Sequence, residues 1–320
     1  MKIAFAGAFA IRLEAQVRAH LPSACDVITA DEGGIAAKLE DVDVLVSMAF
    51  TREMAGAANR LKLVQVPGAG LDRIDRRALP AGAALANAYG HEVGIAEYVI
   101  GAMLALTREL GRLDAALRRG VWESQWAIGV APPAPWPELA GKTLGILGYG
   151  RIGQCLARRA RAFDMTVLAT RRSAMPSDGL ATLGGPDALA DVLTRADYLA
   201  IAMPLTPETR GLLGAPELAS MKRTAMLVNP ARAEIVEEDA LYQALADRQI
   251  AGAALDVWYR YPSRPGAAPP AHRPFHELPN VLMTPHVSGW TEGMLEARAK
   301  LIADNVSRVA RGESPLNLIT

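Results

Sequence analysis

The feature that most constrains the fold is a glycine-rich run, GYGRIG, at residues 148–153. The apolar residues 144–147 precede it, and a helical pattern from Arg151 to Phe163 follows it. A strand, a tight glycine turn and a helix start bring backbone N–H groups and the positive end of a helix dipole to one point. These flanks favour a pyrophosphate site, whereas glycines alone would indicate only an ordinary turn. The predicted dinucleotide-binding residues are Gly148, Tyr149, Gly150, Arg151, Ile152 and Gly153.

Length and composition narrow the class of protein. With 320 residues, the chain can form two domains with separate cores. Its 34 Lys and Arg balance its 34 Asp and Glu, so its charge predicts no binding to nucleic acid or to an anionic membrane. No apolar run is long enough to span a bilayer, and the first residues are typical of a strand and helix rather than a signal peptide. Only Cys25 and Cys155 are cysteines, which favours a reduced, cytoplasmic setting.

Strand-like apolar runs alternate with helical patterns along most of the chain. This alternation predicts an α/β fold with two doubly wound domains, each a parallel sheet covered by helices. The first series of expected strands is Ile3–Ala6, Val27–Thr29, Val44–Ser47, Leu63–Val66 and Ala83–Ala86. The second series is Thr143–Leu147, Thr166–Thr170, Tyr198–Met203, Met226–Asn229, Gly252–Asp256 and Val281–Thr284.

Two long helices and two irregular stretches complete the expected organisation. Residues 92–119 have the pattern of one continuous helix, and residues 291–312 form a tail helix that we expect to return to the first domain. Residues 131–137 are too rich in proline for regular structure. Residues 259–279 are also irregular, and long loops of this kind are often functional.

Four further segments, in this order, resemble the D-isomer-specific 2-hydroxyacid dehydrogenase family. They are VQVPGAGLD at 64–72, VNPAR at 228–232, ALDV at 254–257 and TPH at 284–286. With the glycine run, the resemblance covers nearly the whole chain. It implies a flavodoxin-like substrate domain from residues 1–90 and 288–320, a Rossmann nucleotide domain from residues 91–287, and an active site in the cleft. It also implies a homodimer, with the long helix and the loop after it in the interface.

The resemblance assigns the reaction chemistry to a few residues. His286 matches the catalytic acid/base, since an imidazole can give and take a proton near neutral pH. Arg232 matches the substrate anchor, because a planar guanidinium suits bidentate contact with an oxo acid. Backbone N–H groups at Gly68, Ala69 and Gly70 match a cradle for the substrate carboxylate. A histidine that merely caps a strand end and a simple glycine turn are the plainer interpretations.

The sequence departs from the family pattern at Tyr261. Members usually have a glutamate at this place, which bonds the catalytic histidine and raises its pKa. A tyrosine accepts a hydrogen bond but has no charge at neutral pH. We therefore expect a less elevated pKa for His286, with weaker acid catalysis or another partner, for which Glu92 and Glu277 are candidates. Tyr261 is also expected to line the substrate site.

The expected cofactor is NADP(H), with NAD(H) as the alternative. At the end of the second strand of the nucleotide domain, where NAD enzymes have an acidic residue, the chain has Arg171, Arg172 and Ser173. Two cations and a hydroxyl suit a 2′-phosphate, although a solvated basic turn would have the same composition. The resemblance adds, as further cofactor-binding residues, Met203, Pro204, Asn229, Pro230, Ala231, Asp256, His286 and Gly289.

These features together predict reduction of a small 2-oxo acid, of the glyoxylate or hydroxypyruvate kind, to a D-2-hydroxy acid. Further lining residues are expected at Phe50, Tyr89–His91, Trp258 and Trp290. Two alternatives stay open. One is a formate- or phosphite-type dehydrogenase, although formate dehydrogenases have glutamine where this chain has Tyr261. The other is a non-catalytic protein that senses dinucleotides. No metal site is assigned, since the histidines of the 259–279 loop have no clear third ligand.

Overall fold

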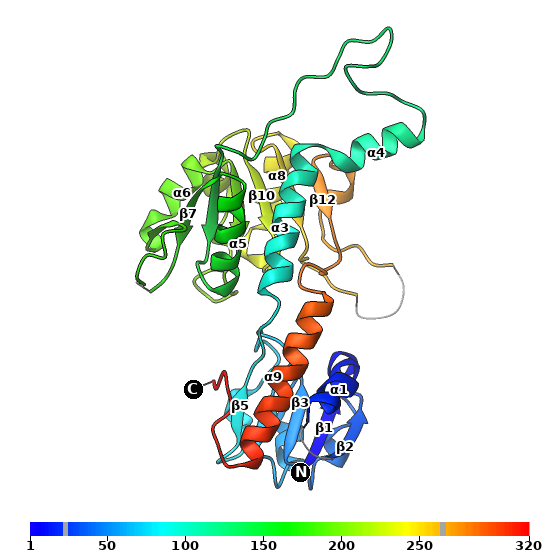
Figure 1. Cartoon of the computed structure of the whole chain (residues 1–320), viewed down its shortest axis with the longest axis vertical. Helices are drawn as coiled ribbons and strands as arrows, with labels where there is room; N and C mark the ends of the chain where they lie inside the picture. The colour runs from blue at the N-terminus through cyan, green and yellow to red at the C-terminus, as the bar shows by residue number, and fades with distance from the viewer. Residues whose placement is uncertain (22–24, 174, 263–266, 320) are drawn as a thin grey trace. The chain divides into compact units, whose positions relative to one another are not determined.

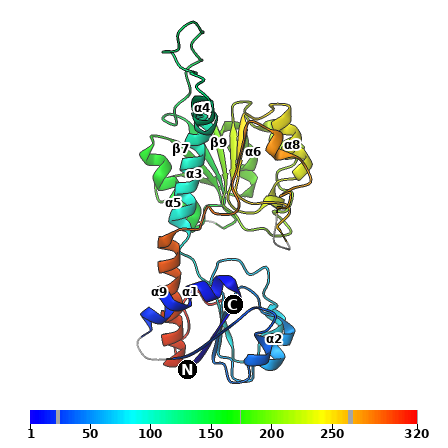
Figure 2. The same cartoon turned by 90° about the vertical axis from the view of Figure 1, so that its right-hand side faces the viewer.

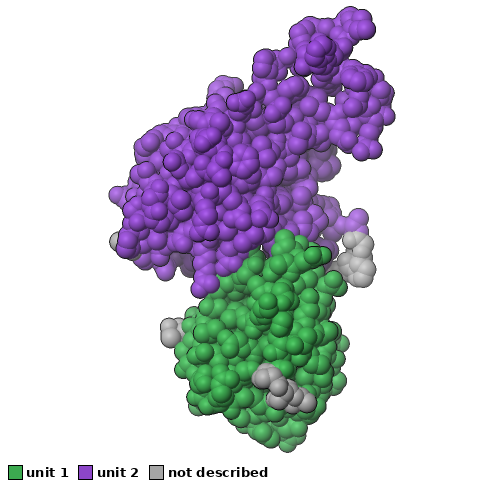
Figure 3. Space-filling view, in the orientation of Figure 1, with its two compact units in different colours: residues 1–91, 290–320 green, residues 92–289 purple. Residues whose placement is uncertain are grey.

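The computed structural model describes residues 1–21, 25–173, 175–262 and 267–319. It divides into two compact units (Figure 3). Each unit has hydrophobic core clusters of its own. Unit 1 comprises Met1–His91 and Trp290–Thr320, and unit 2 comprises Glu92–Gly289. The divisions between the units fall after His91 and Gly289. The boundaries expected from the sequence were after residues 90 and 287.

Unit 1 is built on a five-stranded parallel sheet in the order β2-β1-β3-β4-β5. Its strands are β1 (Lys2–Ala6), β2 (Asp26–Ala30), β3 (Val44–Ser47), β4 (Leu63–Gln65) and β5 (Ala84–Ala86). Its helices are α1 (Ala8–His20), α2 (Arg52–Ala57) and α9 (Glu292–Ala310), with short 3₁₀ turns at Ala36–Lys38 and Arg76–Ala78. The tail helix α9 therefore belongs to unit 1, as expected from its place after the last strand.

Alternate residues of the unit 1 strands face two different helical layers, as the two-residue repeat of a strand requires. Ile3 and Phe5 of β1 pack with Leu13 of α1 and Ile302 of α9, so these two helices cover one face (Figures 1 and 2). Ala4 and Ala6, by contrast, belong to a second cluster that includes Met54 of α2. The sheet is thus buried on both sides, which explains the nearly continuous apolar composition of its strands.

Unit 2 is built on a seven-stranded parallel sheet in the order β12-β11-β10-β9-β6-β7-β8. Its strands are β6 (Thr143–Leu147), β7 (Thr166–Thr170), β8 (Thr182–Gly184), β9 (Tyr198–Ile201), β10 (Met226–Asn229), β11 (Gly252–Leu255) and β12 (Val281–Met283). Its helices are α3 (Glu92–Thr107), α4 (Leu110–Arg118), α5 (Arg151–Ala162), α6 (Leu189–Arg195), α7 (Ala215–Ser220) and α8 (Glu238–Ala246), with 3₁₀ turns at Pro186–Ala188, Ala233–Ile235 and Phe275–Glu277.

The unit 2 sheet is also covered on both faces. Residues such as Ile146 and Ala200 pack with α3 and α5, whereas Leu147 and Leu199 pack with α6, α7 and α8 (Figure 1). The central neighbours β6 and β9 are not consecutive strands, so the chain winds in opposite directions on either side of them. Such a switch point is where doubly wound sheets bind ligands, at the carboxyl ends of the strands. The glycine run follows β6 at this point.

The two expected strand series and the α/β class are confirmed, but one expected helix is wrong. Residues 92–119 form α3 and α4, separated at Glu109, which has a left-handed backbone with φ 50° and ψ 37°. The hydroxyl of Thr107 at the end of α3 is buried and bonded to Tyr198 Oη at 2.7 Å. This anchor holds the end of α3 against the sheet, while α4 leaves it with Leu110 and Leu117 exposed. The short edge strand β8 was not predicted.

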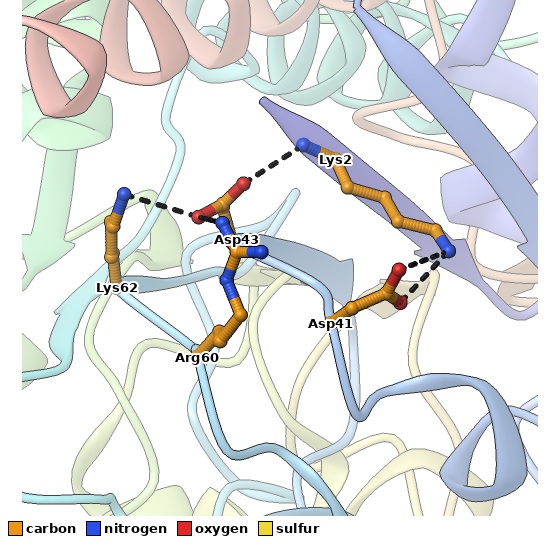
Figure 4. A network of polar contacts seen from close by, with 5 residues as sticks. All are labelled: Lys2, Asp41, Asp43, Arg60 and Lys62. Carbon is orange, nitrogen blue, oxygen red and sulfur yellow. Dashed lines mark hydrogen bonds and ion pairs between the residues drawn. The ribbon is translucent and has the colours of Figure 1, made fainter.

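At the amino ends of the strands of each sheet, one carboxylate links three strands, and it is buried in unit 1 and half-buried in unit 2. Asp43, 3% exposed, accepts the backbone N–H of Lys2 at 3.0 Å and contacts Arg60 and Lys62 at 3.4 and 3.1 Å (Figure 4). Lys2 also pairs with Asp41 at 2.8 Å. In unit 2 the same arrangement recurs: Asp197 accepts the backbone N–H of Thr143 and the ammonium of Lys222, both at 2.8 Å.

Within the described residues, every helix is too short or too polar to cross a lipid bilayer.

Candidate active site

Three neighbouring strands of unit 2 end in the polar residues of the candidate site. Arg232 follows β10, Asp256 follows β11 and His286 follows β12. Because these strands are parallel and adjacent, their carboxyl ends lie at one edge of the sheet. The fold thus brings together residues that are far apart in the sequence.

Asp256 organises the loop that carries His286. Its carboxylate is completely buried and accepts three hydrogen bonds from the loop. Oδ1 accepts from Thr284 Oγ1 at 2.6 Å and from Val287 N at 2.8 Å, and Oδ2 accepts from Ser288 N at 2.8 Å. His286 has a left-handed φ of 59°, which is unusual for a residue with a side chain. We conclude that the three bonds to Asp256 stabilise this otherwise unfavourable conformation.

Two aromatic side chains support Thr284, the first residue of this loop. Tyr98 Oη of α3 lies 2.7 Å from Thr284 Oγ1, and Trp258 Nε1 donates to the Thr284 carbonyl at 2.8 Å. Since Thr284 donates its hydroxyl proton to the carboxylate of Asp256, the proton on this contact comes from Tyr98. Burial raises the pKa of Tyr98 to about 12, so its phenol remains protonated as the donor.

Tyr261 is the hydrogen-bond partner of the His286 imidazole. The distance from Tyr261 Oη to His286 Nδ1 is 2.8 Å. The two glutamates considered as partners lie elsewhere: Glu92 pairs with Arg151 at 4.0 Å, and Glu277 lies 3.9 Å from His276. The phenol therefore occupies the place that a glutamate has in the family pattern.

The electrostatic surroundings favour neutral forms of both rings. Partial removal from water lowers the pKa of His286, the charge of Asp256 raises it, and the charge of Arg232 lowers it, with a net decrease. Partial removal from water likewise raises the pKa of Tyr261, although the Trp258 N–H and Arg232 act in the opposite direction. Arg232 is thus close enough to act on both rings, and the imidazole is mainly neutral at pH 7.

Asn229 positions Arg232 through the turn after β10. Its buried side-chain amide accepts from Ala231 N at 3.0 Å and donates to the Arg232 carbonyl at 2.9 Å. The Arg232 guanidinium, half-buried, donates to the Ala231 carbonyl at 2.8 Å. The turn is therefore held from inside by an asparagine, which can bond both backbone groups at once.

The glycine run has the geometry of a phosphate-binding turn. Gly148 has φ 103°, and a Cβ there would come within 2.7 Å of the Ala202 backbone. A Cβ on Gly153 would come within 2.6 Å of the Gly148 carbonyl oxygen, so this glycine allows α5 to pack on the turn. A Cβ on Gly150, by contrast, would meet no protein atom within 4 Å. The fold itself does not require Gly150, and the open space beside it fits a dinucleotide whose phosphates approach the backbone.

The basic residues after β7 differ in their surroundings. Arg171 turns back over the glycine run, where Nη1 donates to the Tyr149 carbonyl at 2.9 Å and contacts Met175 Sδ at 3.0 Å. Arg172 and Ser173 are exposed. The Tyr149 side chain is buried and donates to Asp178 at 2.7 Å, and its backbone N–H donates to the Thr170 carbonyl at 2.9 Å.

In unit 1, the expected carboxylate cradle is a turn held by Asn87 and Ala88. Asn87 Nδ2 donates to the Ala69 carbonyl at 3.0 Å, and Ala88 N donates to the Gly68 carbonyl at 3.1 Å. In the described part of the chain, no protein acceptor bonds the N–H groups of Ala69 and Gly70. The turn can therefore offer two donors to an anion.

A family model for the D-isomer specific 2-hydroxyacid dehydrogenase, NAD binding domain, matches residues 100–288. The chain belongs to the D-isomer-specific 2-hydroxyacid dehydrogenases. The glyoxylate reductase of Thermococcus kodakarensis is 36% identical over 291 residues, which cover 88% of this chain and 84% of that protein. The D-3-phosphoglycerate dehydrogenase of Methanocaldococcus jannaschii is 35% identical over 88% of this chain, which spans only 52% of that relative's length.

A solved structure extends the likeness to the whole fold. The NADPH-dependent glyoxylate/hydroxypyruvate reductase of Sinorhizobium meliloti, in complex with NADP and sulfate, superposes with a TM-score of 0.80. The two sequences are 25% identical, and the alignment covers 99% of this chain and 97% of that chain. The family and the fold class predicted from sequence are therefore confirmed.

Several residues that were expected to line the substrate site are instead buried in a core or in contact with other side chains of their own unit. Phe50 and Trp258 are buried in the cores of units 1 and 2. The Tyr89 carbonyl and His91 are bonded by Arg298 at 3.2 and 3.0 Å. Trp290 packs on Phe9 with ring centroids 5.7 Å apart. Met203, Pro204, Pro230 and Gly289 lie in loops that follow strands of unit 2.

Sequence reasoning missed the groups that support the site rather than line it. No sequence motif marks Tyr98 or the backbone N–H of Trp258. The fold alone brings Tyr98 to Thr284, and the Trp258 N–H to Tyr261. His272 bonds Glu238 at 3.0 Å. Among the described residues, no group of three or more His, Cys, Asp or Glu is arranged to hold a metal ion.

Proposed function

We propose that this dehydrogenase reduces a small 2-oxo acid to the D-2-hydroxy acid and prefers NADP(H). The supporting observation is a cluster of three side chains beside the carboxyl ends of the unit 2 strands. Tyr261 is hydrogen-bonded to His286, and the charge of Arg232 shifts the pKa values of both rings. A cation that holds an oxo acid beside a ring that handles a proton is the minimum this reaction requires.

Each residue has a distinct role in this proposal. Arg232 binds the carboxylate and polarises the 2-oxo group, because a guanidinium can donate two parallel hydrogen bonds. His286 delivers a proton to the carbonyl oxygen from Nε2, while Nδ1 stays bonded to Tyr261. Ala69 and Gly70 of unit 1 are proposed donors to the carboxylate. When bound at residues 148–153, the reduced dinucleotide supplies the hydride.

The cofactor preference rests on the residues after β7. Arg172 and Ser173 are exposed and offer a guanidinium and a hydroxyl to a 2′-phosphate. Arg171 is proposed to act indirectly, since its Nη1 already bonds the glycine run. The NADPH-dependent reductase from Sinorhizobium meliloti and the glyoxylate reductase relatives are consistent with a small 2-oxo acid and NADP(H).

We further propose a homodimer in a reducing, cytoplasmic setting. Large apolar side chains are exposed on α4 and the segment after it, which extend away from the rest of unit 2 (Figure 1). They are Leu110, Leu117, Val121, Trp122, Trp126, Ile128 and Val130. Such a set of exposed apolar groups is typical of an interaction surface, and a second copy is the proposed occupant. Both cysteines are free thiols, which suits a reducing compartment.

The test is an assay of the purified chain with a panel of 2-oxo acids and both reduced dinucleotides. We expect NADPH-dependent reduction to a D product by chiral analysis. His286→Asn should reduce kcat/KM by about a thousandfold, whereas the exposed His276→Asn should not change it. Oxidation of formate or phosphite, or tight dinucleotide binding without turnover, would contradict the proposal.

A further inference from the structure

The 2.8 Å contact between Tyr261 Oη and His286 Nδ1 has a preferred direction. A phenol is a much stronger acid than a neutral imidazole N–H, and an imidazole nitrogen is a better acceptor than a phenol oxygen. With both rings neutral, the proton on this contact therefore belongs to Tyr261. His286 then has its own proton on Nε2, the nitrogen that is free to face the substrate.

A second contact supports the same direction. The Trp258 N–H points to Tyr261 Oη at 3.4 Å, so the phenol oxygen accepts one hydrogen bond and donates the other. A backbone donor at this oxygen also stabilises negative charge if the phenol proton leaves. Tyr261 is 53% exposed, which gives its oxygen access to protons from solvent.

The surrounding charges are compatible with a proton that moves between the two rings. Arg232 opposes a positive charge on the imidazole and favours a negative charge on the phenol oxygen. Asp256 acts in the opposite sense on both groups, but its carboxylate already accepts three hydrogen bonds from the 284–288 loop. Glu234 is the third charged group that acts on Tyr261, and it favours the neutral phenol.

We propose that Tyr261 supplies the proton for carbonyl reduction through His286, so that the pair works as a phenol–imidazole relay in place of an imidazolium–carboxylate pair. This inference rests on the proposed 2-oxo acid reductase function. It differs from that function in assigning the proton's origin, and it does not need a charged histidine.

The step balances as follows, with a reduced nicotinamide as the hydride donor. As the carbonyl carbon gains the hydride, the C=O π bond breaks and the oxygen takes the proton from Nε2. Nδ1 takes the phenol proton at the same time, so the imidazole stays neutral and Tyr261 becomes a phenolate. After the product leaves, the Nδ1 proton returns to the phenolate and a solvent proton returns to Nε2. The net change is one proton taken from solvent.

The first test reads the proton positions without turnover. We expect ¹⁵N NMR of the full chain, with ¹⁵N-labelled histidine at neutral pH, to show His286 with an unprotonated Nδ1 and a protonated Nε2. His286→Asn assigns the signal. Tyr261→Glu should convert the ring to a form protonated at Nδ1, because a carboxylate can only accept. A wild-type ring protonated at Nδ1 would overturn the relay even if the protein reduces 2-oxo acids.

The second test uses the pH dependence of kcat/KM for reduction. With the relay, activity persists above pH 6.5 and falls only when the phenol ionises. In Tyr261→Phe, reduction requires an imidazolium, so kcat/KM should fall tenfold per pH unit above the pKa of His286. Tyr242→Phe is the matched control, since Tyr242 is a phenol of α8 that packs on Phe275 at 5.6 Å. We expect it to keep the wild-type profile.

A third measurement moves the phenol acidity without removing the hydroxyl. With 3-fluorotyrosine at position 261, the phenol is more acidic, and the alkaline limb of the profile should move to lower pH by the same amount. An unmoved alkaline limb would overturn the relay. Absence of turnover with every 2-oxo acid, combined with the expected NMR tautomer, would reject the proposed function and with it the catalytic use of the hydrogen bond.

Discussion

Short polar side chains set the positions of the larger groups at this site. Asn229 bonds both backbone groups of the turn before Arg232, and Asp256 bonds three groups of the loop around His286. Each is buried at the end of a strand, where a short side chain can reach only the adjacent loop. The rings and the guanidinium of the proposed site are thus oriented by residues that need not contact the substrate.

Arg232→Ala should affect both catalysis and the acidity of His286. We expect kcat/KM to fall by about a hundredfold or more, because a cation at the developing negative charge is lost. The pKa of His286 should rise, since the positive charge of Arg232 lowers it in the wild type. Steady-state kinetics and an NMR titration of His286 measure these changes. The control Arg223→Ala changes an exposed cation before β10 and should alter neither, and an unchanged pKa in Arg232→Ala would contradict the arrangement.

The two arginines after β7 should respond differently to removal. Arg172→Ala should lower the ratio of NADPH to NADH efficiency by about tenfold or more, because the guanidinium proposed to bind the 2′-phosphate is lost. Arg171→Ala should weaken both cofactors, because it loosens the glycine run at Tyr149. Dissociation constants for both dinucleotides distinguish these effects, with Arg195→Ala on α6 as control. An unchanged ratio in both variants would refute the NADP(H) preference.

At the scale of an element, β6, the glycine run and α5 form one strand–turn–helix segment. The glycines of this segment differ in why a side chain is absent. Gly148 and Gly153 meet protein atoms, so the fold needs them, whereas Gly150 faces open space. A similar distinction separates α3 from α4. The former is anchored by Thr107 on the sheet, and the latter begins after the left-handed Glu109 with an exposed apolar face.

Substitution of these glycines should separate folding from ligand binding. Gly150→Ala should change the free energy of unfolding by less than about 1 kcal/mol, since its Cβ meets no protein atom. It should nevertheless weaken dinucleotide binding by about tenfold or more, because the methyl group occupies the phosphate approach. Gly148→Ala is the contrast, with a loss of about 2 kcal/mol or more from its positive φ and its clash with Ala202. Urea unfolding and calorimetric titration check both. Full cofactor affinity in Gly150→Ala would place the phosphates elsewhere.

At the scale of the whole molecule, units 1 and 2 contain the same arrangement of polar contacts around one carboxylate. In each, a carboxylate directly before a central strand accepts the N–H of the first strand and a lysine ammonium from the segment before the next strand. Burial by itself would raise the pKa of Asp43 and of Asp197, but these donors outweigh burial and lower both values. In each unit this arrangement lies at the amino ends of the strands, and in unit 2 the candidate site lies at their carboxyl ends.

Asp43→Asn and Asp197→Asn should each destabilise their own unit. We expect a cost of about 2 kcal/mol at pH 7, since an acceptor that is buried at Asp43 and half-buried at Asp197 loses its charge while its cations remain. Because the pKa is lower in the folded state, the carboxylate stabilises the fold above about pH 4, and this stabilisation is lost as the pH falls through the folded value. The difference from wild type should therefore shrink in acid.

Hydrogen exchange locates the effect of each substitution. Asp43→Asn should increase exchange in β1, β3 and β4, and Asp197→Asn should increase it in β6, β9 and β10. The exposed Asp304→Asn on α9 serves as the control. Equal effects of either variant on both units would show that the units do not unfold separately.

Much of this structure follows from local patterns in the chain. The alternation of apolar and helical runs predicted both sheets, and the order of GYGRIG, VNPAR and TPH predicted the family. The patterns did not predict the break at Glu109, because the residues around it are compatible with a continuous helix. They also left the partner of His286 open among Tyr261 and two glutamates, since these residues are separated by irregular chain.

The sequence by itself determined the fold class, the family and the glycine turn between β6 and α5, because periodicity and backbone conformation depend on neighbouring residues. Only the tertiary structure decided that the Tyr261 phenol bonds His286, that Arg171 turns onto the glycine run and that Asp256 holds the 284–288 loop. Hydrogen bonds form only when two groups approach within about 3 Å. For residues on different loops, that approach is set by how the strands and helices beneath them pack.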